Sequence, residues 1–391
     1  MKQAVILAAG EGQRLRPFTV TKPKVMLSIA GKPMLCYVIE ALAQHGIRNI
    51  VLVVGYRREQ VFDYIGSGEQ FGVKVAYVTQ DKQLGTAHAL AQAKEVAESE
   101  FLVLSGDKLI EPNTIAELVG VKPPALLVKR VDNPNRFGMV MVEGGLVESI
   151  IEKPKQPESN IISTGIYSFT RDIFNSIKQE LDIPDVINSI LAQGRSIAAI
   201  ETSGTWLDVA YPWDILKVND AILHRIPANV SGMIETGVSL KGEVSVGKDT
   251  VIRSNSYLVG PVVIGGGCEI GPNVCIFPST SIGDNVVISP FTEINNSVIG
   301  DDVHIGSGTI IQDSVIDKGC VIGGRFTACS GEAEIKVDKE HHLVEVGAMF
   351  GEGCTLGDSV TAQPGVIVGN YVQIKTQKLI NGRVPDRSLV V

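Results

Sequence analysis

The sequence predicts two consecutive folds, an α/β domain followed by a parallel β-solenoid. Up to about residue 225, short β-rich runs alternate with amphipathic helical stretches, which indicates a largely parallel sheet with helices on both faces. Beyond residue 238, aliphatic residues recur at every sixth position. The 391 residues are also too many for one ordinary core. We therefore expect one domain over residues 1–225 and a second over residues 226–391.

The expected elements of the first domain follow from hydrophobic periodicity. Strands are expected at residues 4–8, 50–54, 73–79, 101–105, 125–129 and 162–169, and helices at 33–45, 86–97 and 212–224. The helix over 33–45 has Pro33 in its first turn, places Leu35, Val38 and Leu42 on one face, and is followed by Gly46.

The second domain is predicted from a six-residue period. The repeated aliphatic positions are Leu240, Val246, Ile252, Leu258, Ile264, Ile270, Ile276, Ile282, Ile288 and Ile294, and the phase resumes through Ile299, Ile305, Ile311, Ile316 and Ile322. Such a period indicates a prism whose coils stack on one another. Glycines that follow the aliphatic residue, such as Gly247 and Gly265, are expected at turns with positive φ.

The repeat lapses over residues 323–346. The charged stretch within it, residues 332–343, is expected to form a loop outside the solenoid. The repeat returns at Leu356, and the pattern assigns no structure to residues 377–391.

Composition excludes several classes of partner. The net charge of −8 argues against nucleic acid or an anionic membrane, and no stretch has the length of a membrane span or the form of a signal peptide. Six cysteines without a Cys-x-x-Cys pair indicate reduced thiols. We expect a cytoplasmic protein.

A glycine-rich, basic segment follows the first expected strand. Residues 10–24 read Gly-Glu-Gly-Gln-Arg-Leu-Arg-Pro-Phe-Thr-Val-Thr-Lys-Pro-Lys, and residues 12–39 contain five Lys or Arg but no Asp or Glu. Free backbone N–H groups and fixed positive charge at the carboxyl edge of a sheet favour phosphate binding. The segment is neither a Walker P-loop nor a dinucleotide fingerprint.

The register of this segment resembles the signature of the sugar-1-phosphate nucleotidylyltransferases. The matching residues are Gly10, Gly12, Arg14, Leu15, Pro17, Thr19, Pro23 and Lys24. The resemblance covers almost the whole chain. It implies a Rossmann-like nucleotidyltransferase domain followed by a left-handed parallel β-helix, as in bifunctional N-acetylglucosamine-1-phosphate uridylyltransferases and glucose-1-phosphate thymidylyltransferase-like proteins.

The resemblance implies roles in nucleotide binding. Arg14 steadies the two phosphates that leave as pyrophosphate, and Lys24 neutralises charge at the α-phosphate. Gln80 reads the base edge. The nucleotide-binding residues implied are Leu7, Ala9, Gly10, Gly12, Gln80, Gly85 and Thr86. An ordinary helix start at Gly85-Thr86 is the alternative, and we expect His88 to be a helix residue rather than a catalyst.

The metal and sugar sites are also implied by resemblance. Asp107 lies at the end of a β-rich run, and Asp208 lies late in the domain. The resemblance implies that both hold Mg²⁺ and act with Arg14 and Lys24 in catalysis. Lys108, and Ala210 where the family usually has glycine, depart from the pattern. The sugar-phosphate residues implied are Gly138, Glu152, Lys153 and Thr164, although Glu-Lys-Pro alone is as often a turn.

The implied reaction joins a nucleoside triphosphate to a hexose 1-phosphate and releases pyrophosphate. The expected nucleotide is UTP or dTTP, and the expected sugar phosphate is N-acetylglucosamine 1-phosphate or glucose 1-phosphate. Three roles stay open for the β-helix. It could assemble the protein as a homo-oligomer, with a trimer favoured, it could exert allosteric control, or it could transfer acetyl from acetyl-CoA to glucosamine 1-phosphate. Assembly is favoured, because residues 304–313 lack the Lys-x-x-His-x-Ser-Tyr-x-Gly-Asp stretch of the bifunctional enzymes. His304, His341 and His342 are the candidate bases.

Overall fold

The chain divides into two compact units in a computed structural model that describes residues 1–338 and 340–391. Unit 1 comprises Met1–Glu11, Pro23–Met26 and Met34–Asp208, and unit 2 comprises Gly12–Lys22, Leu27–Pro33 and Val209–Val391. The glycine-rich segment Gly12–Lys22 therefore groups with the C-terminal part of the chain. The domain boundary expected after residue 225 stays a prediction. Within the described ranges, no helix has the length and apolarity needed to cross a membrane.

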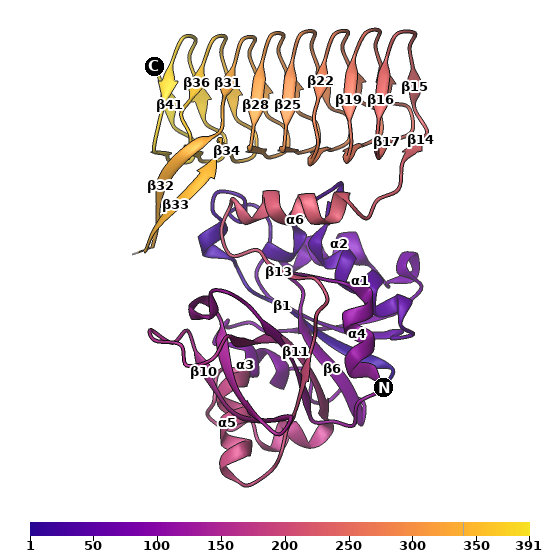
Figure 1. Cartoon of the computed structure of the whole chain (residues 1–391), viewed down its shortest axis with the longest axis vertical. Coiled ribbons are helices and arrows are strands. Elements are labelled where there is room, and N and C mark those ends of the chain that lie inside the picture. Colours follow the sequence, from indigo (N-terminus) through magenta and orange to yellow (C-terminus); the bar gives the residue numbers. More distant parts are fainter. Residues whose placement is uncertain (339) are drawn as a thin grey trace. The chain divides into compact units, whose positions relative to one another are not determined.

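Unit 1 is built on a nine-stranded sheet (Figure 1). In spatial order its strands are β5 (Lys74–Thr79), β4 (Asn49–Val54), β1 (Gln3–Ala8), β6 (Glu100–Ser105), β11 (Ile161–Thr170), β8 (Ala125–Arg130), β12 (Ala198–Glu201), β10 (Leu146–Glu152) and β9 (Gly138–Glu143). The half from β5 to β6 is parallel, whereas β11 runs antiparallel to both β6 and β8. The expectation of a largely parallel sheet is correct for the half from β5 to β6, whereas the other half is mixed, with β8 and β12 as its parallel pair.

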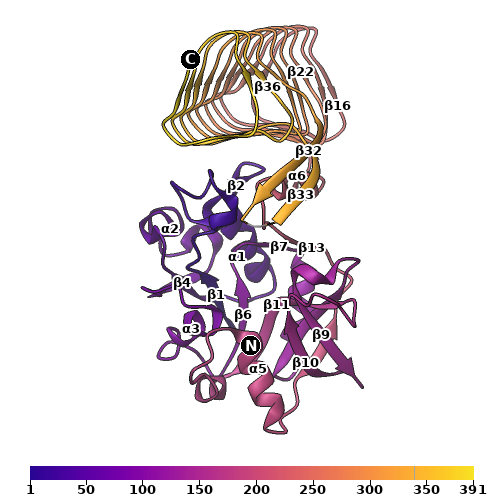
Figure 2. The same cartoon turned by 90° about the vertical axis from the view of Figure 1, so that its left-hand side faces the viewer.

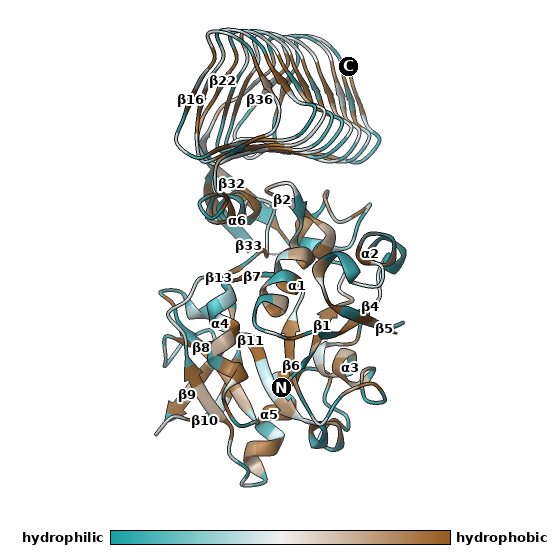
Figure 3. Ribbon diagram, turned by 90° about the vertical axis from the view of Figure 1, so that its right-hand side faces the viewer, coloured by the Kyte–Doolittle hydropathy of each residue, from teal (hydrophilic) through white to brown (hydrophobic). Residues whose placement is uncertain are grey.

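Helices cover both faces of this sheet, as expected. They are α1 (Met34–Gln44), α2 (Arg58–Ile65), α3 (Thr86–Ala91), α4 (Pro112–Val119) and α5 (Ile183–Ala192). Alternate residues of β1 point to opposite cores: Ala4 and Ile6 pack with the cluster that contains α1, and Val5 packs with the cluster that contains α3 and α5. The central strands of the sheet are largely apolar in Figure 3, as expected for strands that are covered on both faces.

Two local predictions in unit 1 need adjustment. Helix α3 ends at Ala91 instead of residue 97, because the following residues tighten into i to i+3 turns, with the Ala93 N–H donating to the Leu90 carbonyl at 2.9 Å. A short antiparallel pair, β7 (Lys108–Ile110) with β13 (Trp206–Asp208), was not expected. This pair brings Asp208 opposite Lys108.

Unit 2 contains the predicted left-handed parallel β-helix, which is seen end-on as a three-sided coil in Figure 2. The first β-helix sheet contains β14 (Asn229–Val230), β17 (Val244–Val246), β20 (Val262–Ile264), β23 (Thr280–Ile282), β26 (Val298–Ile299), β29 (Val315–Ile316), β34 (Met349–Phe350), β37 (Ile367–Val368) and β40 (Arg383–Val384). The second contains β15 (Met233–Ile234), β18 (Val251–Ile252), β21 (Glu269–Ile270), β24 (Val287–Ile288), β27 (His304–Ile305), β30 (Val321–Ile322), β35 (Thr355–Leu356), β38 (Gln373–Ile374) and β41 (Leu389–Val390). The third contains β16 (Ser239–Lys241), β19 (Tyr257–Val259), β22 (Cys275–Ile276), β25 (Glu293–Asn295), β28 (Ile310–Gln312), β31 (Thr327–Ala328), β36 (Thr361–Ala362) and β39 (Leu379–Ile380).

The six-residue period corresponds to the inward positions of these sheets. Aliphatic residues three repeats apart pair in parallel, as Val246 does with Ile264 and Ile252 with Ile270, and they form one buried core. The glycines after them do not have positive φ, contrary to expectation. A Cβ at Gly247 would lie 2.4 Å from the Gly265 carbonyl carbon, so glycine is needed there because the stacked coils approach closely. Positive φ occurs instead at corner residues such as Asp249 and Asn255.

The charged excursion is a hairpin rather than a loop. Its strands are β32 (Gly331–Val337) and β33 (Glu340–Val346), with Lys339 outside the described residues. The coil resumes beyond it, because β34 pairs with β29. The unassigned tail forms β39, β40 and β41.

Unit 2 also holds helix α6 (Asp214–Leu223) and the small pair β2 (Ser28–Ile29) with β3 (Lys32–Pro33). The buried Asn219 side chain links the three parts: its amide donates to the Ser279 carbonyl at 2.9 Å, and its oxygen accepts from the Ser281 hydroxyl at 2.7 Å and the Ala30 N–H at 3.1 Å. These bonds attach α6 and the β2–β3 turn to the first β-helix sheet.

Candidate active site

The carboxyl end of β1 forms the centre of the candidate site in unit 1. Strand β1 lies between β4 and β6, and the chain beyond it stays between them: the Leu7 carbonyl accepts from the Gly106 N–H at 3.0 Å, and the Ala9 carbonyl accepts from the Tyr56 N–H at 3.2 Å. Gly10 follows as an exposed residue. The predicted passage from strand to loop at the sheet's carboxyl edge is present.

Lys24 lies between the two predicted catalytic carboxylates. Its ammonium forms an ion pair with Asp107 and lies 3.8 Å from an Asp208 carboxylate oxygen. All three side chains are largely shielded, with exposed fractions of 16%, 17% and 22%. Asp107 lies two residues beyond the end of β6, whose Ser105 hydroxyl donates to it, and Asp208 ends β13.

The charge state of Asp107 is set by competing effects. Burial disfavours the carboxylate, but the charges of Lys24 and Lys108, together with hydrogen bonds from Lys24 and Ser105, outweigh it and lower the pKa of Asp107 to about 2. The group is therefore an anion at neutral pH.

This pair of carboxylates fits a divalent cation. Magnesium commonly takes one or two carboxylates and completes its shell with phosphate oxygens and water. The ammonium already between Asp107 and Asp208 shows that the site favours positive charge. Among residues 1–338 and 340–391, no cluster of three or more His, Cys, Asp or Glu side chains could hold a metal by itself. A cation here would need ligands from the substrate.

Gln80, expected to read a base, is 3% exposed and has a fixed side chain. Its amide nitrogen donates to the Gly85 carbonyl at 3.0 Å and lies 2.9 Å from His88 Nδ1. With the nitrogen engaged twice, the amide oxygen is presented as the acceptor for a ligand N–H. His88 thus orients a site residue, a role that sequence reasoning missed.

The Gly85-Thr86 turn is fixed by the start of α5. A Cβ at Gly85, where φ is +147°, would lie 2.3 Å from the Leu181 carbonyl oxygen, so the turn requires glycine. One Asp182 carboxylate oxygen accepts from the Thr86 N–H at 2.9 Å and from its hydroxyl at 3.1 Å. Asp182 was also missed, because nothing in the local sequence links it to a turn 96 residues earlier.

A recess of about 290 Å³ adjoins Gln80. Its lining is mostly polar and consists of Gly55, Tyr56, Arg57, Arg58, Glu59, Thr79, Gln80, Asp81 and Gln83. Gly55, one of the lining residues, has no room for a side chain, because a Cβ there would lie 2.9 Å from both Ala9 Cβ and the Gln80 carbonyl oxygen. The two arginines were not selected from the sequence, and they supply positive charge beside Gln80.

The predicted sugar residues divide into two groups. Gly138 pairs with Glu152 across β9 and β10, and a Cβ at Gly138 would lie 3.0 Å from a Glu152 carboxylate oxygen. Lys153 follows with φ +44°, and its N–H donates to the Phe137 carbonyl at 3.0 Å. These residues lie together at one edge of the sheet.

Thr164 is placed differently. Its side chain is fully buried, and its hydroxyl donates to the Leu127 carbonyl at 2.7 Å. Its own carbonyl accepts from Lys108 Nζ at 3.3 Å and from Trp206 Nε1 at 2.9 Å. The Thr164 hydroxyl is thus engaged within the core, and a role in sugar binding stays a prediction.

Gly12 and Arg14 belong to unit 2. Gly12, with φ +74°, precedes a short 3-10 helix (Gln13–Leu15), and its carbonyl accepts from the Thr19 hydroxyl at 2.8 Å, which closes the loop on itself. Arg14 Nε lies 3.3 Å from an Asp338 carboxylate oxygen on the β32–β33 hairpin, with both side chains about half exposed or more. The structure thus brings Lys24, Asp107 and Asp208 together in unit 1, and places Arg14 in unit 2.

Residues 3–225 match the family described as nucleotidyl transferase, and the chain therefore belongs to that family. It is a sugar-1-phosphate nucleotidylyltransferase, an enzyme class that generally uses a divalent metal. Residues 258–334 match a second family, the GMPPB C-terminal domain.

Similar proteins span both parts of the chain. The Bifunctional protein GlmU of Methanococcus maripaludis is 33% identical over 99% of this chain and 96% of its own length. A bifunctional sugar-1-phosphate nucleotidylyltransferase/acetyltransferase of Sulfurisphaera tokodaii is 33% identical over 97% of both chains. A crystal structure from Bacillus anthracis, named as a glucose-1-phosphate thymidylyltransferase, is 31% identical with a TM-score of 0.52, covering 56% of this chain and 93% of that one.

Proposed function

We propose that this enzyme joins UTP to N-acetylglucosamine 1-phosphate, with dTTP and glucose 1-phosphate as the second pair, and that it uses Mg²⁺ in the cytoplasm. The observation that carries the proposal is the Lys24 ammonium between the Asp107 and Asp208 carboxylates. The similarity to proteins named GlmU supports the first pair, and a Streptomyces griseus glucose-1-phosphate thymidylyltransferase, 32% identical over 72% of this chain, supports the second. All six cysteines are free, which suits a reducing compartment.

In the proposed reaction, a phosphate oxygen of the sugar phosphate attacks the α-phosphorus of the triphosphate, and pyrophosphate leaves. Lys24 stabilises the charge that develops at the α-phosphate, and Arg14 binds the departing phosphates. Asp107 and Asp208 hold the cation, which supplies further positive charge to the phosphate oxygens when bound. Positioning and electrostatics suffice, so no covalent intermediate with the protein is needed.

Base selection follows from the Gln80 amide. Uracil and thymine carry an N–H at ring position 3, which an amide oxygen can accept, whereas cytosine has an acceptor there. Because the Gly85 carbonyl accepts from the amide nitrogen, the amide cannot reverse without losing this hydrogen bond. The pyrimidines with an N–H are therefore favoured. Leu7, Ala9, Gly10, Gly12, Gly85 and Thr86 would form the backbone around the nucleotide.

The sugar phosphate is proposed to bind along Gly138, Glu152, Lys153 and Thr164. Partial desolvation of the Glu152 carboxylate raises its pKa, against the lowering effect of Lys153. A carboxylate in this setting can accept hydrogen bonds from sugar hydroxyls, while Lys153 offers charge to the phosphate.

The test is pyrophosphate release across a grid of UTP, dTTP, CTP, ATP and GTP against several sugar 1-phosphates. The expected maximum is UTP with N-acetylglucosamine 1-phosphate, with loss of turnover on chelation and recovery with Mg²⁺. Absence of pyrophosphate release in every combination would contradict the proposal, and a maximum with a purine would overturn the assignment of Gln80.

Acetyl transfer by the β-helix is a second candidate. The relatives named bifunctional raise it, and the hairpin offers one arrangement suited to it: His341 Nδ1 lies 2.9 Å from a Glu334 carboxylate oxygen, which orients an exposed imidazole as a general base. His304 is exposed on β27, whereas His342 stacks against Tyr211 at 4.3 Å between ring centroids.

This candidate is tested by CoA release from acetyl-CoA in the presence of glucosamine 1-phosphate. We expect loss of release in His341→Ala or in His304→Ala, with the exposed Glu332→Gln as the control for the hairpin surface. No release above the rate without glucosamine 1-phosphate would show that the β-helix lacks this activity.

A further inference from the structure

We propose that Asp317 of the β-helix is a positioning residue for nucleotidyl transfer, because it fixes the glycine-rich loop through a shielded ion pair with Lys22. The inference rests on the proposed role of this loop, residues 12–22, in binding the triphosphate. All of the contacts that carry it lie within unit 2.

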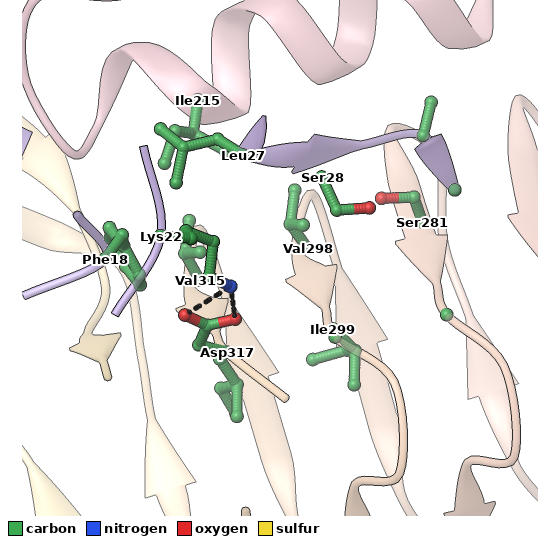
Figure 4. A pocket seen from close by; sticks show the side chains of 15 residues that line it. Phe18, Lys22, Leu27, Ser28, Ile215, Ser281, Val298, Ile299, Val315 and Asp317 are labelled. Atoms are coloured by element: carbon green, nitrogen blue, oxygen red, sulfur yellow. Dashed lines mark hydrogen bonds and ion pairs between the residues drawn. The ribbon is translucent and has the colours of Figure 1, made fainter. Parts of the chain in front are cut away.

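The ion pair is close and shielded. Lys22 Nζ lies 2.7 and 3.0 Å from the two Asp317 carboxylate oxygens, and the side chains are 13% and 11% exposed (Figure 4). The pair borders a narrow cavity of about 30 Å³ whose apolar lining includes Phe18 from the loop and Val315 from β29. Apolar surroundings shield the two charges from water and strengthen their attraction.

Asp317 departs from its own repeat. In the two preceding coils, the residue after the inward isoleucine is glycine: Gly283 follows Ile282 and Gly300 follows Ile299. In the next coil of the same sheet, Asp317 follows Ile316. Asp317 thus adds a carboxylate on the coil whose side chain pairs directly with Lys22, at a position where the solenoid itself does not require one.

Two further coils hold the same loop. The buried Asn370 side chain donates to the Pro17 carbonyl at 3.1 Å, and its oxygen accepts from the Glu352 N–H at 2.9 Å. Burial opposes ionisation of Glu352, but the nearby Thr21 hydroxyl, the Tyr371 hydroxyl, which donates to Glu352 at 2.9 Å, and the charge of Lys318 hold its pKa below the usual value. Asp317, Glu352 and Asn370 come after β29, β34 and β37, which are neighbours in the first β-helix sheet.

The loop is therefore anchored at Pro17 and Lys22 by two coils, with Thr21 near Glu352 of the coil between them. A shielded ion pair adds little net stability, because desolvation offsets the attraction, but removing one partner leaves an uncompensated charge. Its effect is to select one position for the loop. Because Arg14 lies in this loop, the anchors reduce the ordering that the triphosphate must otherwise impose when it binds.

The experiment compares Asp317→Asn, Lys22→Met and the double variant in the full-length enzyme. The matched control is Asp358→Asn, an exposed coil aspartate that accepts from the Gly324 N–H and lies 3.9 Å from Arg325. We measure KM for UTP, KM for the sugar 1-phosphate, the melting temperature and amide hydrogen exchange of residues 12–22.

We expect Asp317→Asn to raise KM for UTP by about 10-fold, since misplacing a binding group by an ångström has effects of this order or larger. KM for the sugar phosphate should stay unchanged in Asp317→Asn, and both KM values should stay unchanged in the control variant. Amide exchange in residues 12–22 should accelerate in Asp317→Asn. The double variant should raise KM for UTP no more than either single variant does, because each single substitution already removes the same interaction.

The outcomes separate the two proposals. If wild type releases no pyrophosphate, the proposed function and this inference both fail. If wild type is active but Asp317→Asn keeps its KM for UTP and its loop exchange, only the inference fails. Should Asp317→Asn not fold, Lys22→Met gives the same test from the loop side, and equal rises in both KM values would indicate general destabilisation instead of positioning.

Discussion

At the residue scale, the acidity of Asp107 depends mainly on one lysine. Its pKa, about 2 in the folded protein against about 3.9 in an unfolded chain, means that Asp107 favours folding above about pH 4 and that this contribution is lost as pH falls toward 2. Without Lys24, burial would act with less opposition and the pKa would rise.

We therefore predict that Lys24→Met moves the acid limb of the pH–activity profile to higher pH and lowers kcat. The exposed Lys94→Met is the control and should leave the profile unchanged. The measurement is pyrophosphate release between pH 4 and 8. An unshifted limb in Lys24→Met would show that Asp107 does not control this side of the profile.

A second prediction concerns the carboxylates themselves. Asp107→Asn and Asp208→Asn should each lower turnover by at least ~100-fold, because each removes charge that holds a cation among the phosphates. Asp63→Asn on the surface of α2 provides the control. Raising the Mg²⁺ concentration should recover part of the rate in the variants, and near-normal rates without it would remove both residues from the metal site.

At the element scale, the start of α5 supports the turn that precedes α3. We predict that Asp182→Ala raises KM for UTP with little change in KM for the sugar phosphate, because Thr86 loses both of its contacts with the carboxylate. Asp182→Asn keeps one acceptor oxygen and should recover most of the affinity. Steady-state kinetics with each substrate varied in turn distinguish this from general damage, which would raise both constants.

The elements that sequence analysis found are those with local signals. The inward residues of the β-helix recur every six residues, and those such as Ile270 and Ile288 are buried as expected. The hairpin was read as a loop because its charges dominate, although Ile335 and Val337 alternate with charged neighbours and are buried.

Long-range partners explain most of what the sequence did not predict. Lys22 appeared only as one of several basic residues, and Asp317, 295 positions later, carried no visible connection to it. One usable signal existed: an aspartate at a position that holds glycine in the two coils before it. Lys24, Asp107 and Asp208 were predicted from resemblance, but the ammonium between the carboxylates required the structure.

At the scale of the whole molecule, the three outer faces of the β-helix differ. Outward residues of the first sheet, including Val298, Val315 and Met349, are buried within unit 2. The outward row of the third sheet contains the partly exposed Tyr257, Cys275 and Ile310, with Glu293 between Cys275 and Ile310. Partly exposed apolar side chains gathered on one face favour a protein contact there.

We predict that the enzyme is a homotrimer through this third sheet and that Ile310→Glu yields a smaller assembly, because the added charge would be desolvated in the contact. Thr355→Glu on the second sheet is the control. Light scattering of the full-length protein gives the mass. A trimer that persists in Ile310→Glu would place the contact elsewhere.

The anchoring of the glycine-rich loop also bears on how the protein is made. Ribosomes release the N-terminus first, and early segments generally fold before later ones appear. Residues 12–22 are synthesised well before Asp317, Glu352 and Asn370, since Lys22 and Asp317 are 295 positions apart. The loop therefore waits for the coils that anchor it before its position is set. On the proposed role of this loop, a polypeptide released before residue 370 would carry residues 12–22 without all of their anchors, and we expect it to bind the triphosphate more weakly than the full chain.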